Sequence, residues 1–213
     1  MRHFTAIDEA IAQFDTTLRT LFIPTHRAAA RKNPGLNYPM AALTAEQKRH
    51  IAGLMRVNHA GEVCAQALYQ GQALTAKLHH VREQMAEAAE EEVDHLAWCE
   101  QRLRELDSQP SVFNPMWYAG SLLIGMVAGL AGDQWSLGFV AETERQVSAH
   151  LERHLRQLPE DDERTMAILA QMHEDETQHA QSAQRAGAAE LPWLIKRLMS
   201  SVSKLMTRSS YYL

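Results

Sequence analysis

The sequence predicts an all-α fold, a four-helix bundle made of two helix pairs. Apolar residues recur at helical spacing along most of the 213 residues, and no stretch keeps the two-residue alternation of a half-buried β-strand. A lone glutamate, followed 30 or 32 residues later by a Glu-x-x-His step, occurs once in each half of the chain. Hydrophobic residues make up 46% of the sequence, so a chain of this length can bury a single core.

The first 43 residues are expected to form an extension, and residues 44–213 the functional domain. Residues 4–21 have the spacing of a short amphipathic helix. Residues 23–43 are expected to be a loop, because three of the seven prolines lie there. No role follows from the sequence of this extension.

Four long helices and a shorter last one are expected after the extension. Thr44 and Gln47 have the spacing of a capping box, in which each side chain bonds to the backbone amide of the other residue. The long helices are expected to cover approximately 44–78, 81–106, 137–158 and 161–187. The last of them ends at a glycine, which is typical of a helix C-terminus.

Between the second and third long helices lies a stretch without any charged residue, 108–132. Its length makes it a transmembrane candidate, but a single crossing would place the two Glu-x-x-His steps on opposite sides of the membrane. We therefore expect an apolar crossover helix within the bundle architecture. It either packs in the core or in an oligomer contact, through a Gly-x-x-x-Gly motif starting at Gly125, or dips into a bilayer interface with Trp117, Tyr118 and Trp135 near the headgroups.

The last helix, expected over 191–206, favours the interfacial interpretation. Its apolar residues recur at helical spacing, and its other residues include several basic ones. A basic amphipathic helix suits an anionic membrane surface, so lipid is an expected partner. An ordinary packing helix with a solvated face is the alternative.

The repeated motif predicts a metal centre with four carboxylates and two imidazoles. The candidate ligands are Glu62, Glu92, His95, Glu144, Glu176 and His179. Residues three apart share one face of a helix, so the Glu and His of each step can reach the same ion. Oxygen-rich ligation with one imidazole per ion suits iron or manganese better than zinc or copper. Such a constellation resembles that of ferritin-like di-iron carboxylate proteins, which predicts a ferritin-like bundle.

The register of the motif leaves alternatives open. Glu91 and Asp175 each lie four residues before the histidine of their motif, so either could face the ion instead. Glu142 competes with the lone glutamate of the second set. His59 and His150 are candidates for a supporting place beside the ligands. A solvated acidic face would explain a single Glu-x-x-His step, and the second copy argues against it.

Several stretches resemble the demethoxyubiquinone hydroxylase family of ubiquinone biosynthesis, and together they span approximately residues 45–213. They are 56–62 (RVNHAGE), 92–96 (EVDHL), 114–117 (NPMW), Glu144 with His150 downstream, 175–179 (DETQH) and the C-terminal Tyr212-Leu213. The first of these and the apolar crossover are far more specific than the Glu-x-x-His step.

The resemblance implies a membrane-bound, non-haem di-iron monooxygenase that hydroxylates the ring of a demethoxyubiquinone or demethoxyubiquinol intermediate with O2. It implies two Fe ions held by the six candidate ligands, with Glu92 and Glu176 bridging, and it favours Glu144 over Glu142. An external reductant is also implied, for which NADH is one candidate. Leu151 stands where some members have a tyrosine, which argues against a tyrosine relay at that place.

A polyprenyl quinone substrate would explain the apolar crossover, since its tail resides in the bilayer. The expected location is therefore peripheral, on the cytoplasmic face of the bacterial cell membrane. A homo-oligomer or a complex of ubiquinone-biosynthesis proteins stays open, as do the tail length and the electron donor.

Other function classes are less consistent with the sequence. The net charge of −5 disfavours nucleic acid as a partner, and with it a transfer-RNA hydroxylase on the same scaffold. A ferritin- or rubrerythrin-like iron-handling protein would use the same ligands but should lack the uncharged crossover. In a metal-free membrane adaptor, the Glu and His residues of the motif would be only polar surface residues. The two cysteines indicate neither a disulfide framework nor a zinc site.

Overall fold

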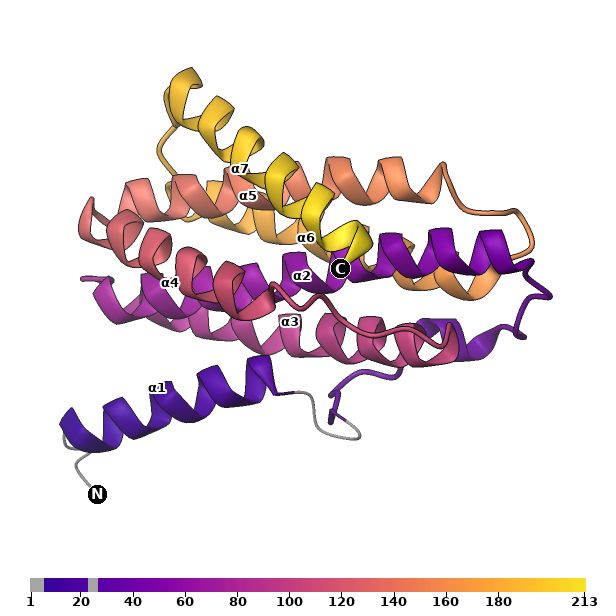
Figure 1. The fold of residues 1–213 in the computed structure, drawn as a ribbon. Helices are drawn as coiled ribbons and strands as arrows, with labels where there is room; N and C mark the ends of the chain where they lie inside the picture. The colour runs from indigo at the N-terminus through magenta and orange to yellow at the C-terminus, as the bar shows by residue number, and fades with distance from the viewer. Residues whose placement is uncertain (1–5, 23–26) are drawn as a thin grey trace.

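The computed structural model describes residues 6–22 and 27–213 (Figure 1). Its helices are α1 (Ala6–Leu21), α2 (Ala45–Thr75), α3 (His79–Glu105), α4 (Asn114–Leu130), α5 (Asp133–Leu155), α6 (Glu163–Arg185) and α7 (Trp193–Tyr212). A short 3-10 turn, η1 (Pro34–Asn37), precedes α2. The described residues contain no β-strand, so the all-α prediction is confirmed.

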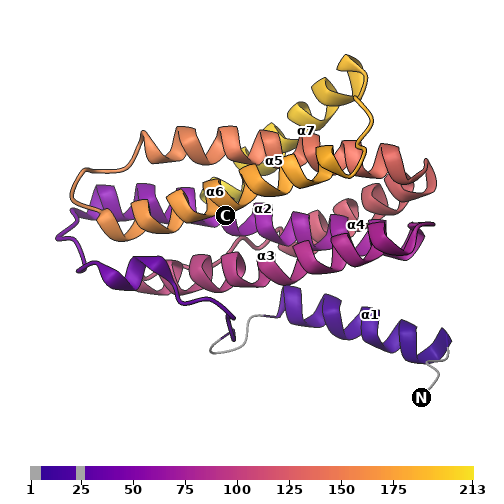
Figure 2. The ribbon, with the colours of Figure 1, turned by 180° about the vertical axis from the view of Figure 1, so that it is seen from behind.

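Helices α2, α3, α5 and α6 form the four-helix bundle, with α2 and α3 as one pair and α5 and α6 as the other (Figure 1). The crossover between the pairs contains α4, which lies along α2. Helix α7 crosses α2 on the same side of the bundle, so that the reverse view has α3 and α6 in front (Figure 2). The predicted ferritin-like bundle, with its crossover helix and C-terminal amphipathic helix, is therefore confirmed.

Apolar side chains fill the bundle in two layers, and each layer takes residues from all four long helices. One includes Ile51, Trp98, Leu151 and Leu169. The other includes Tyr69, Met85, Leu137 and Ala183. On every long helix, the residues of the repeated motif lie between these two sets. The motif is therefore enclosed in the middle of the bundle by apolar layers, whose burial stabilises the fold.

Helix α4 packs closely on α2 because glycines lie where the two helices meet. A Cβ atom at Gly71 would lie 2.4 Å from the backbone oxygen of Leu122, and one at Gly125 would lie 2.4 Å from the backbone oxygen of Leu68. Gly129, the second glycine of the Gly-x-x-x-Gly motif, also faces α2. The motif thus serves a helix contact within this chain.

One expectation for the crossover is wrong. Tyr118, predicted near lipid headgroups, is buried between α1 and α2. Its hydroxyl lies 3.0 Å from that of Thr17 and also bonds to Gln70, because α1 covers this part of α4. Trp117 is half-buried and Trp135 is exposed, and their place near lipid headgroups stays a prediction. Among the described helices, none combines the length and apolar character that a membrane crossing needs.

Two helix ends differ from the predicted ones by several residues. Helix α5 begins at Asp133 instead of near residue 137, because Gly132, with φ of 118°, separates it sharply from α4. Helix α7 reaches Tyr212 instead of residue 206, because its end is held on α2. There the hydroxyl of Tyr211 lies 2.6 Å from Nδ1 of His50.

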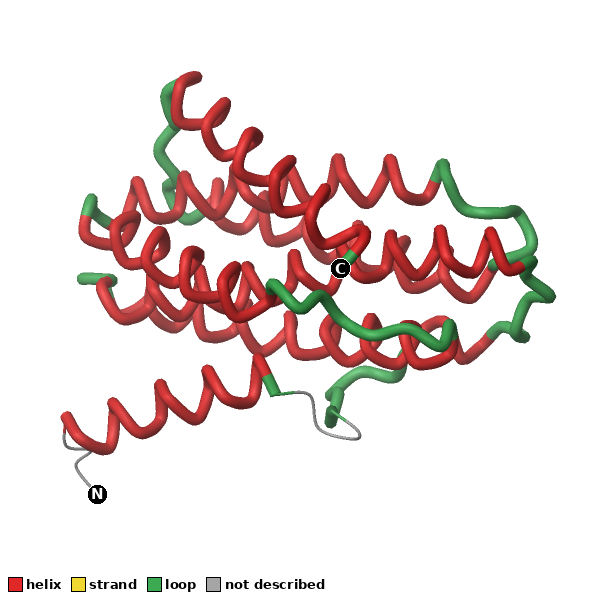
Figure 3. The backbone as a smooth tube through the Cα atoms, viewed as in Figure 1, coloured by secondary structure: helices red, strands yellow, loops and turns green. Residues whose placement is uncertain are grey.

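Residues 27–43 run along α3 and α6 as a mostly irregular segment, here called the N-terminal strap (Figure 3). Apart from η1, this agrees with the predicted loop, and the capping box of Thr44 and Gln47 ends it as predicted. Residues 1–5 and 23–26, which include the start of the first predicted helix, lie outside the described part of the chain.

Candidate metal centre

The four long helices bring the residues of the repeated motif together. Helix α2 carries Glu62, α3 carries Glu92 and His95, α5 carries Glu144, and α6 carries Glu176 and His179. Four of these residues place one oxygen or nitrogen atom each within 4.8 Å of one another, namely Glu62, Glu92, His95 and Glu176. All four are buried, and such a set of oxygen and imidazole donors suits a divalent metal ion.

Nδ1 of His95 faces three carboxylates at once. It lies 2.9 Å from Oε2 of Glu92, 3.2 Å from Oε1 of Glu176 and 3.8 Å from Oε2 of Glu62. The glutamate on α3 is one helical turn away, whereas the other two come from α6 and α2. The tertiary fold therefore assembles this half of the cluster.

The second half of the cluster adjoins the first. Nδ1 of His179 lies 3.3 Å from Oε2 of Glu176 and 3.4 Å from Oε1 of Glu92. Glu144 accepts a hydrogen bond of 2.5 Å from the Tyr69 hydroxyl, and the charge of Glu176 acts on its carboxyl group. Glu92 and Glu176 thus face both histidines, which is the placement of carboxylates between two neighbouring ions.

Asp175 and Glu91, the residues that the sequence leaves open as alternative ligands, lie on the outer side of the histidines. Nε2 of His95 lies 2.9 Å from Oδ2 of Asp175, and Nε2 of His179 lies 2.7 Å from Oε2 of Glu91. The acidic residue before each inward glutamate therefore supports the histidine of the opposite helix pair. The sequence contains both residues, but nothing in their spacing reveals that the support crosses between the pairs.

Glu142 is buried but lies apart from the cluster. It accepts hydrogen bonds from Arg145 and Gln146, and its carboxylate lies 3.9 Å from Nζ of Lys196 on α7. Of the two glutamates on α5 that the sequence leaves open, the fold places Glu144 among the motif residues.

The two supporting histidines suggested by the sequence have other hydrogen-bond partners. His59 is buried, with Nε2 at 3.5 Å from Glu100 and Nδ1 at 3.2 Å from Asn114. His150 is half-buried, and its ring packs edge-on against that of His154 at 4.0 Å between centroids. A supporting role for His59 or His150 stays a prediction.

Burial and mutual repulsion shape the electrostatics of the cluster. Burial and the charge of Glu92 raise the pKa of Glu62 well above its usual range. Burial and the charges of Glu176 and Glu92 do the same to the pKa of Glu144. Burial would lower the pKa of His179, but hydrogen bonds and charges from Glu176 and Glu92 raise it to about 12. With all four carboxylates ionised and both imidazoles neutral, the cluster would carry a large negative charge, so it favours the binding of protons or cations.

Two carboxylate oxygens of the cluster make no hydrogen bond among the described residues, and each lies near a histidine Nδ1, at 3.4 Å for Glu92 and 3.2 Å for Glu176. They are Oε1 of Glu92 and Oε1 of Glu176, and both are buried. Burying a carboxylate oxygen that makes no hydrogen bond costs free energy, unless an opposite charge or a metal ion compensates for it. Both belong to the two glutamates that face both histidines, so the residues present fit the two iron ions that the resemblance implies.

An apolar cavity of about 250 Å³ leads from the cluster to the surface between α4 and α7. Glu62, Glu144 and Glu176 form part of its wall. Its apolar wall includes Leu68, Trp117, Ile124, Phe139, Leu198, Met199, Val202 and Met206. Because Ile124 and Leu198 are also exposed, the cavity opens at the protein surface. An apolar molecule with a polar head could reach the carboxylates by this route.

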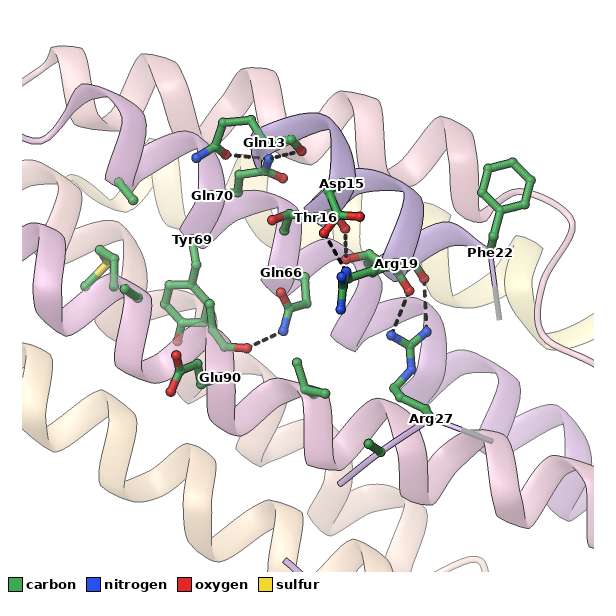
Figure 4. Close-up of a pocket in the computed structure, with 17 residues that line it drawn as sticks. Gln13, Asp15, Thr16, Arg19, Phe22, Arg27, Gln66, Tyr69, Gln70 and Glu90 are labelled. Carbon is green, nitrogen blue, oxygen red and sulfur yellow. Dashed lines mark hydrogen bonds and ion pairs between the residues drawn. The ribbon is translucent and has the colours of Figure 1, made fainter. Parts of the chain in front are cut away.

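A larger hollow, of about 760 Å³, lies between α1 and the α2–α3 pair (Figure 4). The polar side chains that line it form hydrogen bonds mainly with other residues of the protein. Gln70 donates to the side chain of Gln13 at 2.6 Å, and Gln66 donates to a backbone oxygen of α3. Tyr69 lies between this hollow and Glu144. The apolar cavity, which directly includes three carboxylates, is therefore the better candidate for substrate.

Comparison with known proteins identifies the family that the chain matches. A family model described as "Ubiquinone biosynthesis protein COQ7" matches residues 49–210. A protein of Legionella pneumophila named "3-demethoxyubiquinol 3-hydroxylase" is 63% identical over all 213 residues of both chains. Proteins of the same name from Acinetobacter baylyi and Acinetobacter baumannii are 60% identical, again over the full length of both chains.

Proposed function

The chain belongs to the COQ7 family of ubiquinone biosynthesis proteins, and from that premise we propose that it is a 3-demethoxyubiquinol 3-hydroxylase. The proposed reaction inserts one oxygen atom of O2 into a ring C–H bond of the quinol. The second oxygen atom leaves as water, which takes up two protons and two electrons from an external reductant, for which NADH is one candidate. The fold, the enclosed carboxylate cluster and the apolar cavity that reaches it support this activity.

We propose that the cluster holds two Fe ions. Glu62 and His95 would bind one, Glu144 and His179 the other, and Glu92 and Glu176 both. The observation that carries this proposal is the pair of buried oxygens on the two shared glutamates, which form no hydrogen bond and lie close to Nδ1 of the two histidines. When bound, iron supplies the electron transfer to O2 that amino-acid side chains cannot perform.

The protein contributes the orientation of its ligands. A carboxylate only accepts hydrogen bonds, so Asp175 requires a proton on Nε2 of His95, 2.9 Å away. Nε2 of His95 therefore keeps its proton, and Nδ1, the atom that faces the glutamates, is the nitrogen that would give up its proton to bind a cation. Glu91 acts on His179 in the same way. Each histidine therefore keeps its outer proton and presents Nδ1 as the nitrogen that would bind a cation inside the bundle.

Tyr69 performs a related task for Glu144. Its phenol is buried and donates to the carboxylate at 2.5 Å. Burial and the nearby charges of Glu144 and Glu92 raise the pKa of Tyr69 well above its usual range, so the hydroxyl keeps its proton. The donor fixes one oxygen of Glu144 and leaves the other for a cation.

The apolar cavity is the proposed site for the quinol head, with the polyprenyl tail leaving between α4 and α7. Moving such a tail from a bilayer into water would cost about 0.8 kcal/mol per exposed CH2 group. Exposed leucines adjoin lining residues of the cavity along the chain, namely Leu123 beside Ile124 on α4, and Leu194 and Leu205 beside Ile195 and Met206 on α7. We therefore propose a peripheral position on the cytoplasmic face of the cell membrane, with α4 and α7 toward the lipid.

The decisive experiment combines iron content with product formation. Full-length protein loaded anaerobically with Fe²⁺ should hold two ions per chain. With a short-tail demethoxyubiquinol, a reductant and ¹⁸O2, it should release a hydroxylated quinol that carries one ¹⁸O atom, detected by mass spectrometry. Glu92→Ala should abolish product and lower the iron content to one ion or fewer, because it removes a ligand shared by both ions.

Two outcomes would contradict this proposal. Iron in large excess over two per chain, without hydroxylation, would indicate iron storage. Unchanged iron content in Glu92→Ala would show that the cluster does not hold the ions. Glu142→Ala is the matched control, since it removes a buried glutamate of α5 that lies apart from the cluster.

A further inference from the structure

The N-terminal strap reaches the candidate metal centre through one arginine. Arg31 donates from Nη1 to Oδ2 of Asp175 on α6 at 2.8 Å, and from Nε to Oδ2 of Asp94 on α3 at 2.8 Å. Oδ2 of Asp175 is also the atom that Nε2 of His95 approaches at 2.9 Å. One carboxylate oxygen is therefore shared between the guanidinium of the strap and a candidate ligand.

The strap is anchored so that this arginine has little freedom. The backbone amides of Ala30 and Arg31 donate to the two oxygens of Asp94, at 2.6 and 3.2 Å. The guanidinium also lies 5.0 Å from the centre of the Trp98 ring, which in turn lies 5.4 Å from the ring of His95. Arg31 thus approaches His95 from two sides, through a carboxylate and through an indole.

The matched support of His179 lacks the same enclosure. The side chain of Asp175 is only 7% exposed, whereas that of Glu91, which supports His179, is 53% exposed. The guanidinium of Arg31 bonds to Asp175 and Asp94, both on the His95 side of the cluster. The two halves repeat in their ligands but differ in how firmly the outer nitrogen of each histidine is held.

We propose that Arg31 is a positioning residue of the metal centre: by holding Asp175, it keeps Nε2 of His95 as a donor and Nδ1 directed at the ion. The family match covers residues 49–210, so Arg31 lies outside it, in an extension to which the sequence assigns no role. Gln171 holds only the other oxygen of Asp175, at 3.0 Å, and cannot replace the contact at Oδ2. This inference rests on the proposed metal centre.

The test measures Fe²⁺ affinity of the full-length protein under anaerobic conditions, by competition with a chromophoric chelator. Arg31→Met should weaken one of the two ions about tenfold and leave the other unchanged, because changes to the partners of a ligating histidine typically weaken metal binding 10- to 100-fold. The visible spectrum of the Co²⁺-loaded variant should change for one ion only. Arg31→Lys, which keeps the charge but reaches a single carboxylate, should give an intermediate affinity and guards against a folding failure of Arg31→Met.

Arg164→Met is the matched control. Arg164 also ties the strap to the bundle, through the backbone oxygen of Tyr38 at 2.7 Å and Glu105 at 3.0 Å, but it is bonded to none of the motif residues. It should lower thermal stability without changing the affinity for either ion. Arg31→Met added to Asp175→Asn should weaken binding no further than Asp175→Asn alone, since Arg31 acts through that carboxylate.

The outcomes separate this inference from the proposed metal centre. If Arg31→Met binds two ions as tightly as Arg164→Met does, Arg31 has no positioning role, and the proposed metal centre is unaffected. An equal loss at both ions would show a general structural effect and would also overturn the role of Arg31. A wild-type chain that binds no Fe²⁺ would overturn the metal centre and this inference together.

Discussion

At the residue scale, the predictable part of the site is the part that local spacing controls. The Glu-x-x-His steps place Glu92 beside His95 because both lie on one helix face, and the structure has their atoms 2.9 Å apart. Contacts such as Tyr69 with Glu144, 75 residues away, depend on how α2 packs against α5. No periodicity of a single sequence records such a contact, so the ligand candidates could be found and their partners could not.

A pair of histidines on α5, packed edge to face, predicts a dependence of stability on pH. His154 is 4% exposed and its Nδ1 lies 2.9 Å from Oδ1 of Asn58. Burial, with the nearby His150 and Arg153, lowers the pKa of His154 from 6.5 to about 3. Acid therefore protonates the unfolded chain first, so stability is full above about pH 6.5 and falls as the pH drops toward 3.

The variant that tests this is His154→Asn, which keeps a donor for Asn58 and removes the titration. Between pH 6.5 and pH 5, the wild type should lose about 2 kcal/mol more of its unfolding free energy than the variant does, as measured by urea unfolding. His79→Asn, at an exposed position, should keep the wild-type dependence. Identical pH profiles for wild type and His154→Asn would refute the assignment.

At the scale of elements, the sequence identifies α4 as an apolar crossover, but its contacts were not predictable. The Gly-x-x-x-Gly motif was equally consistent with an oligomer contact, and the fold uses it against α2. Tyr118 was misplaced for a related reason. Its burial depends on α1, whose docking is not visible in the sequence of α4 itself. Helix existence follows from local pattern, whereas the partner of each face follows from tertiary packing.

The α2–α4 contact predicts opposite effects for two glycines of the same helix. A methyl group at Gly125 would lie 2.4 Å from a backbone oxygen of α2, whereas at Gly120 it would meet no atom within 4 Å. Gly125→Ala should therefore lower the unfolding free energy by about 1–3 kcal/mol. Gly120→Ala should raise it by about 0.5–1 kcal/mol, since alanine favours the helix. Thermal unfolding measures both, and a stabilised Gly125→Ala would contradict the packing.

At the scale of the whole molecule, helices α4 and α7 lie on one side of the bundle (Figure 1). The apolar cavity lies between these two helices. The strap packs on α3 and α6, and it connects to the cluster through Arg31. The proposed substrate route and the proposed support of His95 thus approach the same metal centre from different elements, through Glu62, Glu144 and Glu176 in one case and through Asp175 in the other. The membrane position remains a prediction that binding to vesicles can test.

Leu205 on α7 is 63% exposed and should contact lipid in the proposed orientation. Leu205→Glu should weaken co-sedimentation with vesicles of phosphatidylethanolamine and phosphatidylglycerol by about tenfold, because burying a leucine side chain is worth about 1.5–3 kcal/mol. Leu36→Glu, at a 43% exposed leucine of η1, should bind vesicles as the wild type does. Equal losses for both variants would refute a lipid-facing role for α7.

The crossed support of the two histidines has a consequence for the internal repeat. His95 belongs to the first helix pair and is oriented by Asp175 of the second, while His179 of the second is oriented by Glu91 of the first. Neither half of the chain contains both a ligand histidine and the carboxylate that orients it. The repeat is therefore one interlocked unit and not two independent copies joined by a linker, and an ancestral half-length chain of this design would have been competent only as a pair.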